Sequence, residues 1–337
     1  MEDNCTGKIA CVTGSPGFVG QHLVRALLSR GWKVRRLLRR NSPRENAKSE
    51  LSNSSLESLM IGDKDYPDLR DALDGASVFF NLAGVVRARS EGEFFKGNVE
   101  FTKKIVKSVE RDRGAHFQRF IHISSLAARG PSKDGEPLDE NAQASPVGCY
   151  ARSKLEGEKA VLEFAGKMPL VILCPCAVYG PGDLAFLELF RIMRLGIAFY
   201  PLGDFQISLV HVEDLVDAIL KATVSAVPSG SIYNISGEGR IRHSELASIL
   251  ADFYGHHCFR VPLPTSLFSL AAFFLEIASA RREKIPFFNS QKAQDICGGN
   301  WLCNNSKAKR ELDFKPAWEI EAGLRSTFDW YIQNGWI

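Results

Sequence analysis

A cluster of three glycines near the start of the chain constrains its fold more than any other feature. Gly14, Gly17 and Gly20 stand at G-x-x-G-x-x-G spacing, after an apolar run over residues 9–12 and before a segment with helical spacing of apolar residues. This order predicts a strand, a tight turn and a helix. There Gly14 can take a positive φ, Gly17 lets the backbone approach a pyrophosphate, and Gly20 lets helix and strand pack closely. The helix N-terminus would face that anion, although any loop between strand and helix can carry glycines.

Short apolar runs recur through the first half of the chain and alternate with segments of helical spacing. They cover residues 9–12, 34–38, 59–61, 77–82, 119–123 and 170–173. The alternation predicts an α/β fold of the Rossmann type, a doubly wound parallel sheet with its ligand at the carboxyl ends of the strands. We expect residues 1–180 to form the dinucleotide-binding domain. Residues 181–337 are expected to form a smaller substrate-binding part interleaved with the main sheet, because residues 209–214 and 233–235 still read as elements packed on it.

Composition and charge exclude several classes of protein. The formal charge of +3 is too small to indicate binding to nucleic acid. The N-terminus lacks the basic start and apolar core of a secretory signal, so a cytoplasmic location is expected. Eight cysteines include no C-x-x-C pair and have no histidine partners at zinc-ligand spacing, so we expect no metal site.

The most apolar stretch of the chain covers residues 267–280. As a helix it would span about 21 Å, less than the roughly 30 Å of a bilayer core. A lid or a core helix is the simplest interpretation. The alternative is an interfacial helix that makes a peripheral membrane contact and through which an apolar substrate arrives.

A tyrosine and a lysine at helical spacing supply candidate chemistry. Tyr150 and Lys154 are four residues apart, which places them on one face of a helix. A free tyrosine titrates near about 10, and a lysine cation beside it favours the phenolate and lowers that pKa. Ser124 and Ser125 close the strand at 119–123, where a hydroxyl could hydrogen-bond a substrate carbonyl or simply cap the next turn. Together these residues predict an acid–base site.

Further short segments complete the pattern: GD at 62–63, NLAG at 81–84, GNV at 97–99, VYGPGD at 178–183, HVED at 211–214 and NSKAKREL at 305–312. With them, the chain resembles the extended short-chain dehydrogenase/reductase family, also called the NAD-dependent epimerase/dehydratase group. The resemblance covers nearly the whole length. It implies an NAD(P)-dependent enzyme that acts on a small-molecule substrate, and by analogy a homodimer.

The resemblance also implies a role for each matching residue. Tyr150 would be the general acid–base, Lys154 would lower its pKa and hold the nicotinamide ribose, and Ser125 would supply the catalytic hydroxyl. Asn98 matches a position that is mainly structural. The other cofactor-binding residues that it implies are Gly14, Ser15, Gly17, Phe18, Val19, Gly20, Arg39, Asp63 at the adenine, Asn81, Ala83, Gly84, and Pro175 and Val178 beside the nicotinamide.

The end of the second strand bears on the choice of cofactor. NAD-preferring relatives carry an acidic residue there that accepts hydrogen bonds from the ribose. This chain has Arg39 instead, matching the arginine of NADP-using reductases, and Arg40 or Ser42 could assist it. A guanidinium would pair with the 2′-phosphate. We therefore expect NADP(H) to be preferred, with NAD(H) as the alternative. If the arginines have no role in binding, they simply form a solvated basic loop.

Departures from the family pattern narrow the reaction. Leu126 stands where sugar dehydratases begin an Asp-Glu pair, and Ala177 and Ile207 replace the asparagine and arginine with which epimerases contact the diphosphate. Arg191 or Arg194 could substitute. We expect hydride transfer between NADP(H) and a secondary alcohol or ketone of a largely apolar substrate. A nucleotide-sugar epimerase with retained cofactor and a non-catalytic NADP-binding protein are the alternatives. The aromatic residues that could line the pocket or the core are Phe186, Phe190, Phe199 and Phe205.

Overall fold

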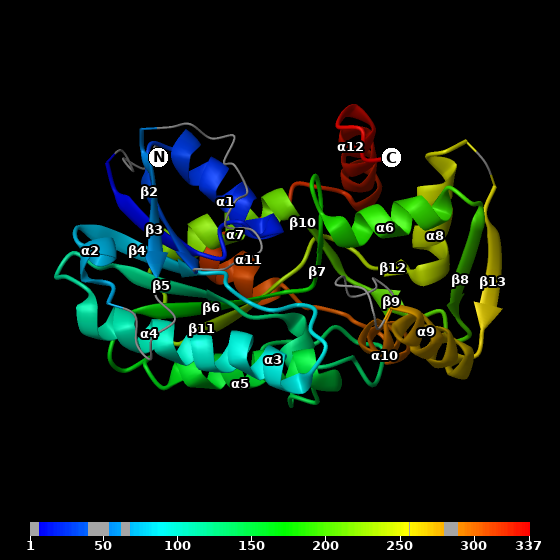
Figure 1. Cartoon of the computed structure of the whole chain (residues 1–337), viewed down its shortest axis with the longest axis horizontal. Helices are drawn as coiled ribbons and strands as arrows, with labels where there is room; N and C mark the ends of the chain where they lie inside the picture. Colours follow the sequence, from blue (N-terminus) through cyan, green and yellow to red (C-terminus); the bar gives the residue numbers. More distant parts are fainter. Residues whose placement is uncertain (1–6, 40–53, 62–67, 256, 280–288) are drawn as a thin grey trace.

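The core of the protein is a seven-stranded parallel sheet (Figure 1). The structure, a computed structural model, describes residues 7–39, 54–61, 68–255, 257–279 and 289–337. The strand order is β3-β2-β1-β4-β5-β6-β11, and every neighbouring pair is parallel. The strands are β1 (Ile9–Thr13), β2 (Lys33–Arg39), β3 (Leu56–Ile61), β4 (Ala76–Asn81), β5 (Arg119–Ile123), β6 (Leu170–Pro175) and β11 (Ser231–Ile235).

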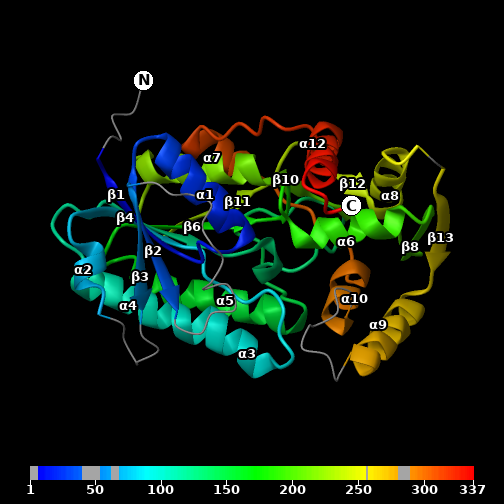
Figure 2. The same ribbon diagram turned by 45° about the horizontal axis from the view of Figure 1, so that its top comes forward.

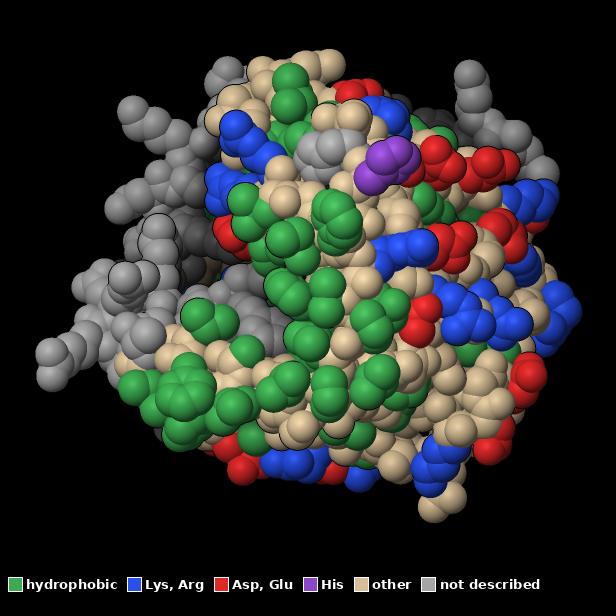
Figure 3. Space-filling view, turned by 90° about the vertical axis from the view of Figure 1, so that its right-hand side faces the viewer, with side chains coloured by type: hydrophobic (Ala, Val, Ile, Leu, Met, Phe, Trp, Pro, Cys, Tyr) green, Lys and Arg blue, Asp and Glu red, His purple; other side chains and the backbone are tan. Residues whose placement is uncertain are grey.

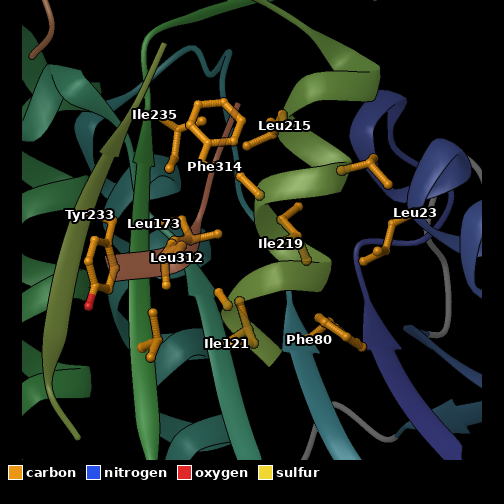
Figure 4. Packing of buried hydrophobic residues seen from close by; sticks show 14 of the residues in the cluster. Leu23, Phe80, Ile121, Leu173, Leu215, Ile219, Tyr233, Ile235, Leu312 and Phe314 are labelled. Carbon is orange, nitrogen blue, oxygen red and sulfur yellow. The ribbon is translucent and has the colours of Figure 1, made fainter. Parts of the chain in front are cut away.

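Helices cover both faces of this sheet. One face packs against α1 (Phe18–Ser29), α7 (Val212–Val224) and α11 (Ser306–Leu312) (Figure 4). The other packs against α2 (Arg70–Leu73), α4 (Phe101–Asp112) and α5 (Gly148–Leu162). Phe79 and Phe80 belong to the two different clusters, because successive side chains of a strand point to opposite faces. The doubly wound α/β fold predicted from the sequence is therefore confirmed.

The rest of the chain forms an outer end beside the carboxyl edge of the sheet (Figures 1 and 2). Its strands form three two-stranded pairs: β7 (Ala177–Tyr179) with β10 (Leu209–His211), β9 (Gln206–Ile207) with β12 (Ile241–Arg242), and β8 (Ile197–Pro201) with β13 (Phe259–Leu263). Its helices are α6 (Leu184–Met193), α8 (His243–Asp252), α9 (Thr265–Ser279), α10 (Ser290–Cys297) and α12 (Ile320–Gln333). A separate apolar cluster joins α6, α8 and α12, and it includes Phe186 and Phe190. These two aromatics are core residues.

The segment 209–214 differs in part from its prediction. Residues Leu209–His211 pair with β7 outside the main sheet, and α7 starts at Val212. His211 caps α7, its side chain accepting a hydrogen bond from the Glu213 N–H. The segment 233–235 does lie in the main sheet, as part of β11. Within the described part of residues 181–337, one strand, β11, belongs to the main sheet, and two helices, α7 and α11, pack on it.

The predicted glycine turn has the expected geometry. Gly14 has a φ of +71°, and a Cβ there would lie 2.6 Å from the Ala83 N. A Cβ on Gly20 would lie 2.3 Å from the Gly14 O, so α1 can pack on the turn only with glycine at this position. The loops after β1 and β4 therefore meet at the edge of the sheet where ligands bind in such folds.

Candidate active site

The N-terminus of α1 suits the pyrophosphate of a dinucleotide. Gly17 caps the helix with extended backbone and, as a glycine, has no side chain to bond the N–H groups of the first turn. That turn has no acidic residue, so its positive partial charge is not neutralised. The Ser15 hydroxyl is buried and has no hydrogen-bond partner within the described part of the chain. Free N–H groups, a buried hydroxyl and a backbone without Cβ atoms together fit a bound anion.

Arg39 lies at the carboxyl end of β2, next to this turn. Leu37 of the same strand pairs with Thr13, the last residue of β1, so Arg39 lies two residues past the end of β1, where the glycine turn begins. The side chain is exposed, and its guanidinium carbon lies 5.2 Å from the centre of the Phe101 ring. The position suits an adenosine ribose or its phosphate. Arg40, Ser42 and Asp63 lie outside the described residues.

The loop after β4 is fixed by two buried asparagines. The Asn81 amide contacts the Thr13 hydroxyl at 2.7 Å and the His122 Nδ1 at 3.1 Å, so its side chain points into the sheet. The Asn98 amide holds both the N–H and the C=O of Val85, at 2.7 and 2.9 Å, and donates to the Ser153 hydroxyl. Asn98 thus fastens this loop to α5, in keeping with the structural role expected for it.

The loop brings two further predicted residues toward the candidate catalytic lysine. Ala83 lies beside the glycine turn, and an added Cβ on Gly84 would lie 3.8 Å from the Lys154 Nζ. A cofactor placed along this loop would therefore run from the glycine turn to Lys154.

Ser125, Tyr150 and Lys154 meet at the carboxyl end of β5. Ser125 begins the 3-10 turn Leu126–Ala128, and its hydroxyl accepts a hydrogen bond from the Ala127 N–H at 3.1 Å. Tyr150 lies in the first turn of α5, close enough to Ser125 for that side chain to lower the pKa of its phenol. The Lys154 Nζ donates to the Ile123 carbonyl at 2.7 Å. Three residues predicted from two separate motifs thus form one cluster.

The pKa of the tyrosine differs from the sequence-based expectation. Burial raises the pKa of Tyr150 to about 12, the hydrogen bond from Ser125 opposes the rise, and the charge of Asp295 adds to it. The Lys154 amine donates to the backbone of β5. That Lys154 lowers the pKa of Tyr150 stays a prediction. Burial lowers the pKa of Lys154 itself to about 8, against the raising effect of Cys174 and Glu158.

Pro175 and Val178 flank the carboxyl end of β6. Pro175 is the last, buried residue of the strand and pairs with Ile235. Val178 is half-buried in β7 and pairs with Val210. Between them lies Ala177, an exposed residue without a polar side chain. This edge of the site is apolar.

Two groups near the site were missed by sequence reasoning. Arg129 and Glu158 form a buried ion pair behind Lys154, and the Cys174 thiol lies 3.5 Å from the second Glu158 oxygen. The position of Glu158, four residues after Lys154 on the same helix face, could have indicated this ion pair. Asp295 approaches Tyr150 from α10, nearly 150 positions along the chain, and no local pattern marks it.

The structure bears on the metal and membrane predictions only within the described residues. Within them, no group of three or more His, Cys, Asp or Glu could hold a metal ion. Likewise, none of the helices in those ranges is both long and apolar enough to cross a bilayer.

Comparison with known proteins identifies the family of the chain. The model of the NAD dependent epimerase/dehydratase family matches residues 10–236. A ceramide reductase of Caulobacter vibrioides is 29% identical over 100% of this chain and 98% of its own length. The 4-hydroxy-2-methyl-3-oxo-4-farnesyl-3,4-dihydroquinoline-1-oxide ketoreductase of Stigmatella aurantiaca is 26% identical over 93% of each chain. The solved UDP-glucuronic acid 4-epimerase of Bacillus cereus, with UDP-glucuronic acid and NAD, gives a TM-score of 0.75 at 21% identity over 97% and 99% of the two chains.

A doubly wound sheet with a glycine turn beside a Ser-Tyr-Lys cluster defines a nicotinamide-dependent enzyme of the extended short-chain dehydrogenase/reductase type. The chain belongs to the NAD dependent epimerase/dehydratase family, as the sequence predicted. Because solved neighbours at this level of identity share the fold alone, the reaction must be argued from the site.

Proposed function

We propose that the protein is an NADPH-dependent reductase of a ketone carried by a small, largely apolar substrate. The observation that carries the proposal is the meeting of Ser125, Tyr150 and Lys154 at the end of β5, beside the glycine turn. The ceramide reductase and the quinoline-oxide ketoreductase support it, since both names describe reductions and the second substrate carries a farnesyl group.

The site residues divide the work of a carbonyl reduction. The hydroxyls of Ser125 and Tyr150, which lie close to each other, bind the carbonyl oxygen between them. Tyr150 then gives its proton to that oxygen as the alcohol forms. A pKa of about 12 keeps its phenol protonated at neutral pH, the form that donates a proton in the reduction. The reverse oxidation uses the same groups. The dinucleotide, when bound, supplies the hydride that reaches the carbonyl carbon.

Arg39 supports NADPH over NADH. The guanidinium is exposed at the end of β2, where it would meet the 2′-phosphate in a charge-assisted pair. The described residues of β2 carry no acidic side chain that would accept hydrogen bonds from a ribose diol. Both observations point to a phosphate at this end of the site.

The surroundings of Ala177 and Ile207 weigh against a nucleotide sugar. Neither side chain can donate a hydrogen bond to a diphosphate. Arg191, which could have substituted, is bonded to Glu188 at 2.9 Å and to the Trp336 carbonyl at 2.9 Å. A diphosphate at this edge would lose charge pairing worth about 1.5–3 kcal/mol for each missing contact.

A substrate screen tests the proposal. The purified protein is given NADPH or NADH with a panel of ketones, the matching alcohols and UDP-sugars, while the absorbance of the reduced cofactor is followed. We expect oxidation of NADPH with apolar ketones and little response to UDP-sugars. Isomerisation of a UDP-sugar without net consumption of cofactor would instead identify an epimerase. Binding of NADPH with no turnover of any substrate would favour the non-catalytic alternative.

A further inference from the structure

Three charged side chains lie buried together behind the candidate site. Lys154 and Glu158 are four residues apart on α5, and so lie on one face of that helix. Arg129 directly follows the 3-10 turn Leu126–Ala128 and forms an ion pair with Glu158. The side chains of Arg129 and Glu158 are 5% and 3% exposed. Because replacing a buried ion pair by apolar residues is often neutral or stabilising, stability alone does not account for this cluster.

The two carboxylate oxygens of Glu158 have different partners. Its Oε1 accepts a hydrogen bond from the Arg129 guanidinium, and its Oε2 lies 3.5 Å from the Cys174 thiol of β6. Burial raises the pKa of Cys174 well above its usual value, so this thiol is neutral. Among Arg129, Lys154, Glu158 and Cys174, the negative charge is therefore carried by Glu158.

The groups that face Lys154 from α5 and β5 are neutral apart from Glu158. The Ile123 carbonyl of β5 accepts a hydrogen bond from the amine at 2.7 Å. Burial lowers the pKa of His122, on the same strand, well below its usual value, and it therefore holds no charge at neutral pH. Tyr150, on α5, is protonated because burial raises its pKa to about 12. Glu158 thus stands beside the amine as a charged group among neutral ones.

Two further acids lie near the cluster and act on its other members. Asp295 acts on Tyr150 from α10, and Glu140 acts on Arg129. The Glu140 carboxylate also accepts a hydrogen bond from the Asn234 N–H at 2.9 Å. These acids approach the cluster from outside α5.

Burial and the charge of Glu158 act on Lys154 in opposite directions. Burial lowers the pKa of the amine to about 8, and the carboxylate one helical turn away raises it. A thiolate at Cys174 would act in the same direction as Glu158, but this thiol is neutral. Since the pKa of the amine lies only about one unit above neutral pH, loss of the neighbouring charge would leave much of it deprotonated.

We propose that Glu158 is a positioning residue that acts through Lys154: its buried carboxylate keeps the amine charged at neutral pH, and Arg129 holds the carboxylate in place. The part that this plays in the reaction rests on the proposed function, in which Lys154 stands beside Tyr150 and the dinucleotide. The effect of Glu158 on the amine belongs to the protein without cofactor, whatever reaction follows.

Nuclear magnetic resonance of the protein without cofactor measures this effect. Lysine labelled with ¹³C at Cε reports the protonation of each amine through its chemical shift, and Lys154→Arg identifies the signal. The parent protein should titrate near pH 8. We expect Glu158→Gln to lower this midpoint by about one pH unit or more. The matched control on the same helix is Glu156→Gln, which removes an exposed carboxylate paired with Lys159 and should leave the midpoint unchanged.

A second variant covers the case in which Glu158→Gln does not fold, because that change leaves the Arg129 charge buried without its anion. Arg129→Met/Glu158→Met removes both charges and fills the space with apolar side chains. We expect a smaller drop of the midpoint in the same direction, since a cation is removed as well. Cys174→Ser keeps a hydroxyl beside Glu158 and should titrate like the parent protein. Circular dichroism verifies that each variant is folded.

The proposal is overturned if the midpoint of Lys154 is the same in the parent protein and in the folded Glu158 variants, which would leave the ion pair a structural role only. It is also overturned if Cys174→Ser moves the midpoint as far as they do. Because the titration uses neither substrate nor cofactor, it can fail while the proposed reduction stands. Equally, the substrate screen can fail while Glu158 still controls the charge of Lys154.

Discussion

The sheet and the α9, β8 and β13 side of the outer end differ in how far their apolar side chains are buried. Phe79 and Phe120 stack at 5.5 Å inside the sheet cluster and are fully buried, whereas Phe259 and Phe274 of the outer end are mostly exposed. Both regions have apolar sequences, but only the sheet has helices on each face to cover them. The apolar residues of the sheet are thus covered by helices of the same chain, whereas Phe259 and Phe274 lie on the surface. Figure 3 shows hydrophobic side chains gathered on that side of the molecule.

The largest effect should come from the glycine turn. Gly20→Ala places a Cβ 2.3 Å from the Gly14 O, a backbone atom that cannot move without distorting the turn. We expect a loss of about 1–3 kcal/mol in the free energy of unfolding, as in other overpacked sites. NADPH affinity should fall with it. Gly166→Ala, whose Cβ would meet nothing within 4 Å, is the matched control and should leave both unchanged. Equal behaviour of the two variants would refute the assigned packing role.

A smaller effect is expected from Arg39, which should change the preference for NADPH over NADH. Arg39→Ser removes one charge-assisted pair with the 2′-phosphate, so we expect NADPH affinity to fall roughly tenfold or more while NADH affinity stays the same. Fluorescence titration of both reduced cofactors measures this. Arg36→Ser, on the same strand but bonded to Ser58, is the control. An equal loss of both cofactors in Arg39→Ser would mean that Arg39 acts on the fold and not on the phosphate.

The lowered pKa of Lys154 predicts how kcat/KM depends on pH above neutrality. With a pKa of about 8, its cation is present below that pH and is lost as the pH rises through it. Since kcat/KM reports groups of the free enzyme, we expect it to fall about tenfold per pH unit above that value. In Lys154→Arg the cation persists, so this decline should disappear whatever the absolute rate. A decline that remains in the variant must come from another group.

The smallest effect is expected at the outer end. Leu270→Ser replaces a half-exposed side chain on the uncovered face of α9 and should change the free energy of unfolding by less than about 0.5 kcal/mol. Leu250→Ser, in the buried cluster of α8, should unfold far more readily. Chemical denaturation of the two variants measures the difference. A large loss from Leu270→Ser would show that α9 is a core helix, and the contrast between the two regions would fail.

Much of the sheet could be predicted because its signals are local. A strand that is covered on both faces is a continuous apolar run, and a positive φ at a turn calls for glycine, so Gly14 and β4 are visible in the sequence. The spacing of Tyr150 and Lys154 is likewise local. The raised pKa of Tyr150 was not predictable, because burial and the charge of Asp295 in α10 raise it, and both depend on the tertiary structure. The amine of Lys154 is bonded to the Ile123 carbonyl. The exposure of α9 depends on which neighbours cover it, and helical spacing alone carries no such information.

Transfer of isotope from cofactor to product tests the central claim most directly. NADPH deuterated at the transferred position is incubated with an apolar ketone found in the screen, and the alcohol is analysed by mass spectrometry. We predict one deuterium in the alcohol for each NADPH consumed. Tyr150→Phe should bind NADPH normally but transfer the label at least about a hundredfold more slowly. Tyr200→Phe, on β8, should match the parent protein. Near-normal transfer by Tyr150→Phe would contradict the account.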